Sequence, residues 1–207
     1  MILTLLLACG SSPTPSPDLV VVTWDTVRAD HVGGATPWLT TRSERAAVFT
    51  QARTVAPLTL PAHASLLTGD YPHVHGARAN AGFPFQGRTL AHELSEAGYA
   101  TGAFVSSAVL AWGQGLGSGF SHYDDEVGDA QARYFGERSG AQTVQRALDW
   151  AAAQPADQPL FVWVHLFDAH APLNLDPEQV RRWGDGYTAE VHQVDQASAA
   201  LWALGLP

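Results

Sequence analysis

Short apolar runs alternate along the chain with segments in which apolar residues recur at helical spacing. The apolar runs are rich in β-branched and aromatic residues, which favours buried strands, whereas three- and four-residue spacing favours amphipathic helices. The strands that we expect cover residues 19–25, 49–55, 100–105 and 160–164. The helices that we expect cover residues 36–45, 62–67, 89–97, 140–153 and 187–204. This alternation predicts an α/β fold, with a mostly parallel sheet and helices on both of its faces.

Three of the expected strands lead into polar residues that suit a binding site. The first run ends at Asp25, the run from residue 100 leads into Ser107, and the run from residue 160 leads towards His170. In open α/β sheets the binding crevice lies at the carboxyl ends of the strands, so these side chains are expected to share one site. His165 continues its strand directly, and this position favours packing over chemistry.

The segment 57–69 places a hydroxyl where a helix begins. Pro61 fits the first turn of a helix, where its missing N–H would have no partner. The free N–H groups and the dipole at a helix start favour a sulfate or phosphate beside Thr59. His63 follows four residues later and returns to the same side after one turn. Taken alone, the pattern is more typical of a capped surface helix. Because Asp25 and His170 follow other expected strands, we favour Thr59 as a nucleophile.

The bulk composition is that of a globular domain with an acidic balance. The chain has 207 residues, of which 46% are hydrophobic, and this is enough for one sizeable core. The formal net charge of −9, with no basic cluster, argues against nucleic acid as a partner. All 11 basic residues are arginine, so no lysine can serve as an acid or a phosphate ligand. The acidic run at 124–126 is expected to be a solvated loop.

The single cysteine lies close to the N-terminus. Residues 1–8 form an apolar segment too short to cross a bilayer, and Cys9 follows it in a cleavage-like pattern. The segment resembles the lipobox of bacterial lipoproteins, and residues 10–17 resemble the flexible tether that follows it. We therefore expect a signal peptide at 1–8, with a lipidated cysteine and tether at 9–17. The protein would be anchored by lipid to a bacterial membrane in the cell envelope, outside the cytoplasm. The alternative is a disordered tail with a chance cysteine.

Four segments, in order along the chain, together resemble a known enzyme family. They cover residues 22–31, 36–39, 59–69 with 71–76, and 167–172. They are similar to the sulfatase and phosphonate monoester hydrolase branch of the alkaline-phosphatase superfamily. The resemblance implies one alkaline-phosphatase-like catalytic domain over residues 18–207 that lacks the C-terminal part of the family's domain.

The resemblance also implies roles at the reaction centre. Asp25 and Thr59 would bind the same divalent ion, which could be calcium, zinc or manganese. Thr59 would be the nucleophile, because a divalent cation lowers the pKa of a hydroxyl and prepares an alkoxide. His170 would contact the anion or protonate the leaving oxygen. His63 stands where the family has an arginine that holds the anion.

The activity implied is metal-dependent hydrolysis of a sulfuric or phosphoric ester of a small molecule or a glycan. Asn80 and Ser107 fall where the family places substrate contacts.

Departures from the family leave two alternatives open. Thr59 stands where sulfatases convert a cysteine, so formylglycine chemistry is excluded there, and Thr26 replaces an aspartate ligand. The family's remaining ligands lie on a later strand, which would follow residue 207. One alternative is a phosphotransferase of the same superfamily, which passes the group to an acceptor other than water. The other is a truncated, catalytically inactive sulfatase-like lipoprotein.

Overall fold

The computed structural model describes residues 16–128, 136–173 and 177–201. The strands in this part are β1 (Leu19–Trp24), β2 (Ala100–Val105), β3 (His122–Asp124) and β4 (Leu160–Leu166). They form one sheet in the order β1-β4-β2-β3, and every hydrogen-bonded pair of strands is parallel. The parallel α/β architecture expected from the sequence pattern is therefore confirmed.

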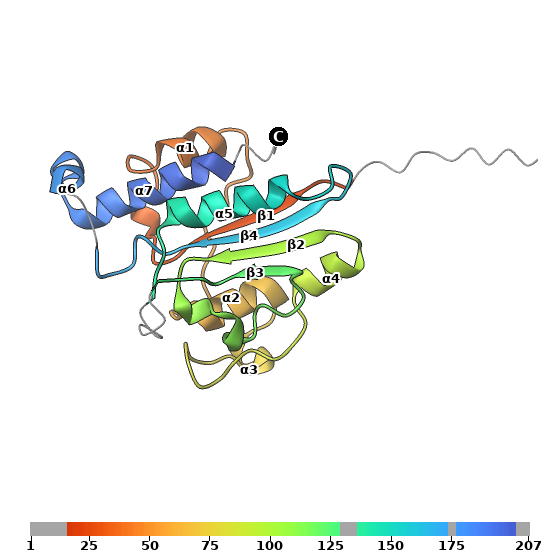
Figure 1. Cartoon of the computed structure of the whole chain (residues 1–207). Helices are drawn as coiled ribbons and strands as arrows, with labels where there is room; N and C mark the ends of the chain where they lie inside the picture. Colours follow the sequence, from red (N-terminus) through yellow and green to blue (C-terminus); the bar gives the residue numbers. More distant parts are fainter. Residues whose placement is uncertain (1–15, 129–135, 174–176, 202–207) are drawn as a thin grey trace, which may run out of the picture.

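Helices cover both faces of this sheet. They are α1 (Pro37–Ser43), α2 (Thr59–Thr68), α3 (Pro72–His75), α4 (Leu90–Glu96), α5 (Gly140–Ala152), α6 (Pro177–Trp183) and α7 (Gly186–Ala200). Figure 1 shows α2, α3 and α4 on one side of the sheet, and α1, α5 and α7 on the other. The five helices expected from apolar spacing are present, although their ends differ by a few residues and residues 202–204 lie outside the described part.

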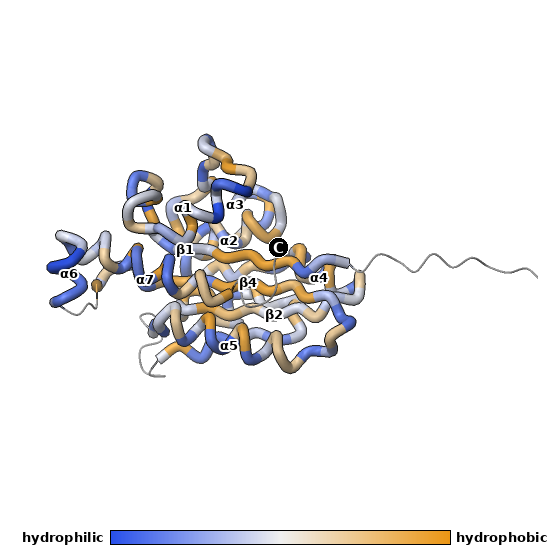
Figure 2. Tube along the Cα trace, turned by 90° about the horizontal axis from the view of Figure 1, so that it is seen from above, coloured by the Kyte–Doolittle hydropathy of each residue, from blue (hydrophilic) through white to orange (hydrophobic). Residues whose placement is uncertain are grey.

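The alternation of side chains along β4 decides which residues face each layer. Phe161 and Trp163 pack into the apolar cluster that contains residues of α2 and α4. Val162 and Val164 pack into the cluster on the α5 and α7 side. Because successive side chains of a strand point to opposite faces, His165 faces α2, as Trp163 does. Figure 2 shows these apolar stretches running along the strands through the middle of the molecule.

β1 lies at the edge of the described sheet. It pairs only with β4 among the described strands, and Thr23 lies opposite His165 in the register. Most of its residues are half-buried and Leu19 is exposed, whereas all six residues of β2 are buried. The sequence predicted a buried parallel strand here; the strand and its direction are confirmed, but an edge position leaves its side chains less covered.

Two sequence expectations about local structure are wrong. Residues 49–55 form no strand: they are an exposed segment between α1 and α2, and Phe49 is 83% exposed. A strand needs a hydrogen-bonded neighbour, and no described strand pairs with this segment. The acidic run at 124–126 is not wholly a solvated loop, because Asp124 ends β3 and is buried. Its carboxylate accepts a hydrogen bond of 2.6 Å from the buried guanidinium of Arg138.

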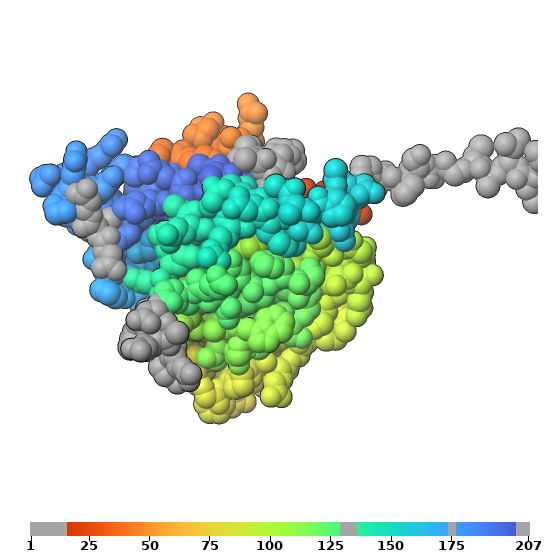
Figure 3. Space-filling model, viewed as in Figure 1, coloured from red at the N-terminus to blue at the C-terminus, as the bar shows by residue number. Residues whose placement is uncertain are grey.

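The periphery is polar. In Figure 2, α6 is hydrophilic, and in Figure 3 it protrudes from the body of the molecule beside α7. Over the residues that the structure describes, no helix combines the length and the apolar character needed to cross a membrane.

Candidate active site

The carboxyl end of β1 delivers Asp25 to the face of the sheet that α2 covers. The backbone N–H of Asp25 donates to the carbonyl of Leu166 at 2.9 Å, which extends the pairing of β1 with β4 by one step. The chain then turns at Thr26, whose φ is +57°. The Asp25 side chain is 9% exposed, so the carboxylate lies almost entirely inside the protein.

Thr59 is the first residue of α2 rather than its cap. Leu58 holds the N-cap position with an extended backbone, and its side chain makes no capping hydrogen bond to the helix start. Asn80 supplies a partner instead, since its side-chain oxygen accepts a 3.0 Å hydrogen bond from the N–H of Leu60. The helix ends at Gly69, which adopts the left-handed conformation typical of a C-terminal glycine. This arrangement fixes the position of Thr59 over the end of β1.

His63 lies one helical turn after Thr59 and is buried. Its Nδ1 lies 2.8 Å from the Thr59 carbonyl and donates to it, which leaves Nε2 as the ring nitrogen with a free lone pair. Burial, followed by the proximity of His165, lowers the pKa of His63 to about 4. The imidazole is therefore neutral at physiological pH, so it can act as a ligand through Nε2 but not as a cationic anion holder.

His165 is wholly buried, and its Nε2 lies 3.2 Å from a carboxylate oxygen of Asp25. Its ring meets the ring of His63 edge to face, with centroids 4.9 Å apart. Among the residues that the structure describes, its Nδ1 has no hydrogen-bond partner. A buried ring nitrogen without a partner is costly, and such groups concentrate at functional sites. The sequence expectation of packing alone missed this contact.

The Asp25 carboxyl stays ionised because its neighbours outweigh its burial. Burial raises its pKa, but the hydrogen bond and the nearby charge of His165 lower it, as does the Thr59 side chain close by. The net pKa of Asp25 lies below its usual range. The Thr59 side chain therefore lies near an ionised carboxylate.

Asp25, His63 and His165 form a group that could hold a metal ion. One donor atom from each residue lies within 4.8 Å of the others. The donor that each offers is a carboxylate oxygen or a ring nitrogen, and this set suits a borderline transition metal such as zinc. The hydrogen bond from His63 Nδ1 to a carbonyl is the kind of outer contact that orients a metal-binding histidine.

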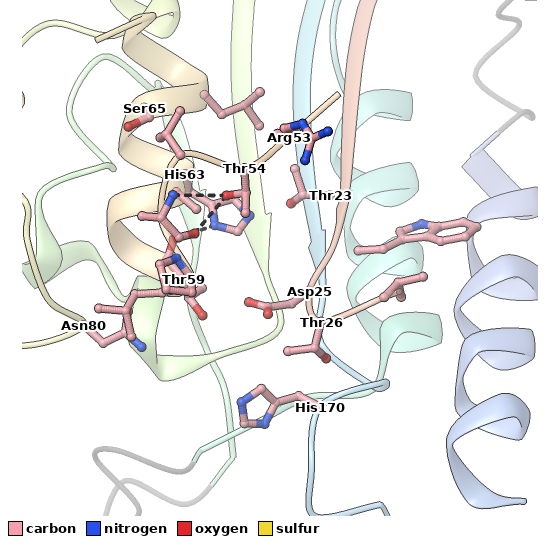
Figure 4. A pocket seen from close by; sticks show the side chains of 18 residues that line it. Thr23, Asp25, Thr26, Arg53, Thr54, Thr59, His63, Ser65, Asn80 and His170 are labelled. Carbon is pink, nitrogen blue, oxygen red and sulfur yellow. Dashed lines mark hydrogen bonds between the residues drawn. The ribbon is translucent and has the colours of Figure 1, made fainter. Parts of the chain in front are cut away.

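His170 reaches the site from the segment after β4. Its ring stacks on Phe167 with centroids 4.2 Å apart, and its Nδ1 donates to the Ala171 carbonyl at 2.7 Å. These contacts fix the ring and leave Nε2 available to a ligand. In Figure 4, His170 and Thr59 lie on different sides of the Asp25 carboxylate.

A cavity of about 730 Å³ joins these residues. Five of the residues singled out from the sequence line it: Asp25, Thr59, His63, Asn80 and His170. Arg53 also lines it, at the end away from His170 in Figure 4, although it was not singled out from the sequence.

Two other sequence candidates lie elsewhere. Ser107 is not among the lining residues; it is buried, and its hydroxyl accepts the N–H of Val109 at the start of a 3₁₀ helix, Ala108–Leu110. Its role as a substrate contact stays a prediction. Cys9 and its lipidation lie outside the described residues.

The alternation of side chains along a strand could have placed His165 beside α2, whereas no pattern in the sequence could have placed Arg53 in the cavity. His165 follows Trp163 by two positions and therefore shares its face of β4, and that face meets α2. Arg53 lies in an irregular exposed segment, where no periodicity indicates direction.

Comparisons with known proteins agree on one fold. The sulfatase family model matches residues 17–199. No curated protein shows a significant match. A solved protein of the alkaline phosphatase superfamily from Vibrio parahaemolyticus aligns with a TM-score of 0.67 and 19% identity, covering 91% of this chain and 50% of that one.

Two further solved structures align in the same way. The putative sulfatase yidJ from Bacteroides fragilis gives a TM-score of 0.71 and 16% identity, covering 92% of this chain and 58% of that one. BT4656, solved with its substrate D-glucosamine-2-N,6-O-disulfate, gives a TM-score of 0.64 and 17% identity, covering 81% and 37%. The chain thus spans between about a third and three fifths of the length of these three proteins.

Proposed function

Because the chain belongs to the sulfatase family, we propose that it hydrolyses sulfuric or phosphoric esters with Thr59 as the nucleophile. The observation that carries the proposal is that Thr59, the first residue of α2, lines the same cavity as the buried Asp25 carboxylate, whose pKa the Thr59 side chain helps to lower. The positive end of that helix favours the sulfate or phosphate group of a substrate beside the Thr59 hydroxyl.

The proposal includes a divalent ion, and the residues around Asp25 fit one. Asp25, His63 and His165 would hold it, with the Thr59 hydroxyl beside them. Imidazole nitrogens suit zinc and other transition ions, whereas calcium prefers a larger set of oxygen ligands. Of calcium, zinc and manganese, we therefore expect zinc to bind best. When bound, such an ion lowers the pKa of a neighbouring hydroxyl and neutralises charge on the ester oxygens.

The first half of the reaction transfers the sulfuryl or phosphoryl group to the protein. The Thr59 oxygen attacks the sulfur or phosphorus atom, and its proton passes to the nearby Asp25 carboxylate. The bond to the leaving oxygen breaks. Protonated His170 gives its Nε2 proton to that oxygen, so an alcohol departs and a threonine ester remains.

The second half returns the protein to its starting state. Water attacks the sulfur or phosphorus atom of the threonine ester and gives one proton to the neutral His170. The Thr59 oxygen leaves and recovers its proton from Asp25. Sulfate or phosphate is released, and the proton count over both halves balances.

The substrate that we propose is the sulfate or phosphate ester of a sugar or a small alcohol. A sulfated sugar is the substrate named for BT4656, which shares the fold. Thr59 cannot become a formylglycine, so a threonine ester is the intermediate that remains. Such an ester suits phosphoryl transfer as well as sulfate hydrolysis. Both ester types therefore belong in the test.

The experiment compares the whole chain with Thr59→Ala and with Thr59→Ser, which keeps the hydroxyl. Each protein is stripped with a chelator, reloaded with zinc, manganese or calcium, and assayed on 4-nitrophenyl sulfate and 4-nitrophenyl phosphate. We expect Thr59→Ala to lower kcat by about 10³-fold or more and Thr59→Ser to retain most of it. Mass spectrometry of acid-quenched protein should find the transferred group on residue 59.

The result that overturns the proposal is equally definite. Turnover in Thr59→Ala equal to that of the unaltered protein excludes the threonine nucleophile. Absence of turnover with every ion and both esters supports the inactive homologue instead. Transfer of the group to an added alcohol faster than to water supports the phosphotransferase.

We also propose that the protein is anchored in the cell envelope through a lipid on Cys9. The support is the lipobox-like sequence before it. Metabolic labelling with an alkyne fatty acid in a bacterial host should mark the unaltered protein and not Cys9→Ser. Equal labelling of both proteins contradicts this anchor.

A further inference from the structure

The residue that follows Asp25 has an unusual backbone conformation. Thr26 has a φ of +57°, and it is the one described residue other than glycine with a positive φ. Its side chain is β-branched, and such residues are genuine outliers in the left-handed region. A strained conformation of this kind persists only where surrounding contacts hold it, and it concentrates at functional sites.

Contacts from two distant segments hold this turn. The Thr26 hydroxyl donates to the Ala169 carbonyl at 3.0 Å, next to His170. On the other side, the Tyr187 hydroxyl donates to the Thr26 carbonyl at 2.7 Å. The same hydroxyl accepts the N–H of Arg28 at 2.8 Å, so Tyr187 bridges both backbone groups of the turn.

Tyr187 is itself fixed in place. It lies in the first turn of α7, where the Asp185 side chain caps the helix by accepting the N–H of Thr188 at 2.8 Å. The His31 ring meets the Tyr187 ring edge to face, with centroids 4.8 Å apart. A half-buried phenol held at both its ring and its hydroxyl is a rigid clamp for the segment it touches.

The turn decides where the Asp25 carboxylate points. The left-handed step at Thr26 directly follows Asp25 and brings the chain against Tyr187 in the first turn of α7. With that step in place, the Asp25 carboxylate keeps its hydrogen bond with His165 and lies near Thr59.

We propose that Tyr187 is a positioning residue for Asp25 and acts through the strained backbone of Thr26. This inference rests on the proposed function for its catalytic consequence, but its structural content stands apart from catalysis. Tyr187 touches neither the substrate cavity nor the donor group of Asp25, His63 and His165. Its hydroxyl fixes the turn, and the turn fixes the carboxylate.

The test uses the whole chain and four variants. Tyr187→Phe removes one hydroxyl and with it both backbone contacts. Thr26→Asn replaces the strained residue with one that enters the left-handed region more readily, and the double variant combines the two. Tyr71→Phe is the matched control, because Tyr71 is exposed and stacks on His73 away from the cavity.

Two readouts are measured for each protein: the ¹⁵N chemical shifts of the His165 ring, which need no turnover, and kcat with KM on the better ester. We expect Tyr187→Phe to shift the His165 resonances and to lower kcat by about 10-fold with little change in KM. Because Thr26 lines the cavity, Thr26→Asn serves as the reference for the double variant, and the two should share the same His165 resonances and kcat. Tyr71→Phe should match the unaltered protein.

Three outcomes overturn the proposal. Unchanged His165 resonances in Tyr187→Phe show that the clamp does not position Asp25, whatever the activity. Resonances in the double variant that are shifted from those of Thr26→Asn show that Tyr187 acts by another route than the Thr26 backbone. A rise in KM with an unchanged kcat shows that Tyr187 acts on substrate binding. If no protein turns over any ester, the proposed function fails, and the resonances still decide this inference.

Discussion

The Nε2 atom of His165, on β4, lies 3.2 Å from a carboxylate oxygen of Asp25, at the end of β1. The contact joins neighbouring parallel strands at their carboxyl ends, and α2 closes over it with His63 and Thr59. An ionised carboxylate buried between two imidazoles is a ligand group as well as a partner for a hydroxyl. Metal binding, the response to pH and the stability of the fold depend on this arrangement and on the packing that supports it.

Removing His165 should weaken metal binding. His165→Gln takes away one of three donors, so we expect the affinity for zinc to fall by about 100-fold or more. Isothermal titration calorimetry on chelator-treated protein measures this directly. His73→Gln is the control, since His73 is exposed and outside the donor group. Equal zinc affinity in His165→Gln and the unaltered protein would exclude His165 as a ligand.

The metal-free protein should lose stability as the pH falls through the weakly acidic range. The pKa of His63 is about 4 in the folded chain against 6.5 for the free side chain, so the unfolded state binds its proton first. The free energy of unfolding should drop from about pH 6.5 downwards and level off near pH 4, by about 3 kcal/mol from this group.

His63→Gln provides the comparison, because it removes this titration and keeps a polar side chain. Urea unfolding at a series of pH values should give a flatter profile for the variant between pH 6.5 and 4. Parallel profiles for the two proteins over that range would contradict the burial of a neutral His63.

His170 should matter most for esters with poor leaving groups. A general acid contributes about 10²- to 10⁴-fold where the leaving oxygen needs a proton, and little where it departs as a stable phenolate. We therefore expect His170→Gln to lose far more kcat on an alkyl or sugar ester than on a 4-nitrophenyl ester. An equal loss on both kinds of ester would instead indicate that His170 holds the anion.

Removing Arg138 should destabilise the fold, because it takes one partner away from the buried ion pair of Asp124 and Arg138. The Arg138 guanidinium also donates to the Val105 carbonyl at 3.1 Å and to the Thr143 hydroxyl at 3.0 Å. Arg138→Met leaves the buried Asp124 carboxylate with Arg146, at 3.0 Å, as its remaining arginine partner, and we expect a loss of about 2 to 3 kcal/mol in the free energy of unfolding.

Chemical denaturation of Arg138→Met beside Arg88→Met makes this comparison. Arg88 forms its ion pairs with Glu93 and Glu96 on the surface, where solvent screens them, so its replacement should change the unfolding midpoint little. Similar midpoints for the two variants would show that the buried pair is not special.

Sequence patterns predicted most of the elements because each pattern is local. The run 100–105 combines small and apolar residues with β-branched Thr101 and Val105, which favours a buried strand, and β2 occupies those same residues. The helical spacing at 140–153 likewise became α5. The run 49–55 also contains aromatic and β-branched residues, together with Gln51 and Arg53, but no described strand pairs with it, and its backbone is irregular and exposed.

The candidate site divides in the same way. Strand ends and a helix start can be read from the order of residues, so Asp25, Thr59, His63, Asn80 and His170 could all be named in advance, and all line one cavity. The strand pattern indicated the face of β4 on which His165 lies, but not its contact with Asp25, which lies 140 residues away in the sequence. The ion pair of Asp124 with Arg138 was also missed, because neither residue belongs to a pattern that indicates its partner.

By itself the sequence determined the alternation of strands and helices, and it placed a hydroxyl and a carboxylate at the ends of elements where parallel sheets form their sites. Only the tertiary structure decided the pairing of β1 with β4, which sets His165 opposite Thr23 and within reach of Asp25. It also decided the left-handed turn at Thr26, which Tyr187 and Ala169 hold from different parts of the chain. Periodicity reports how one segment meets its surroundings, whereas register and long-range hydrogen bonds depend on which segments meet.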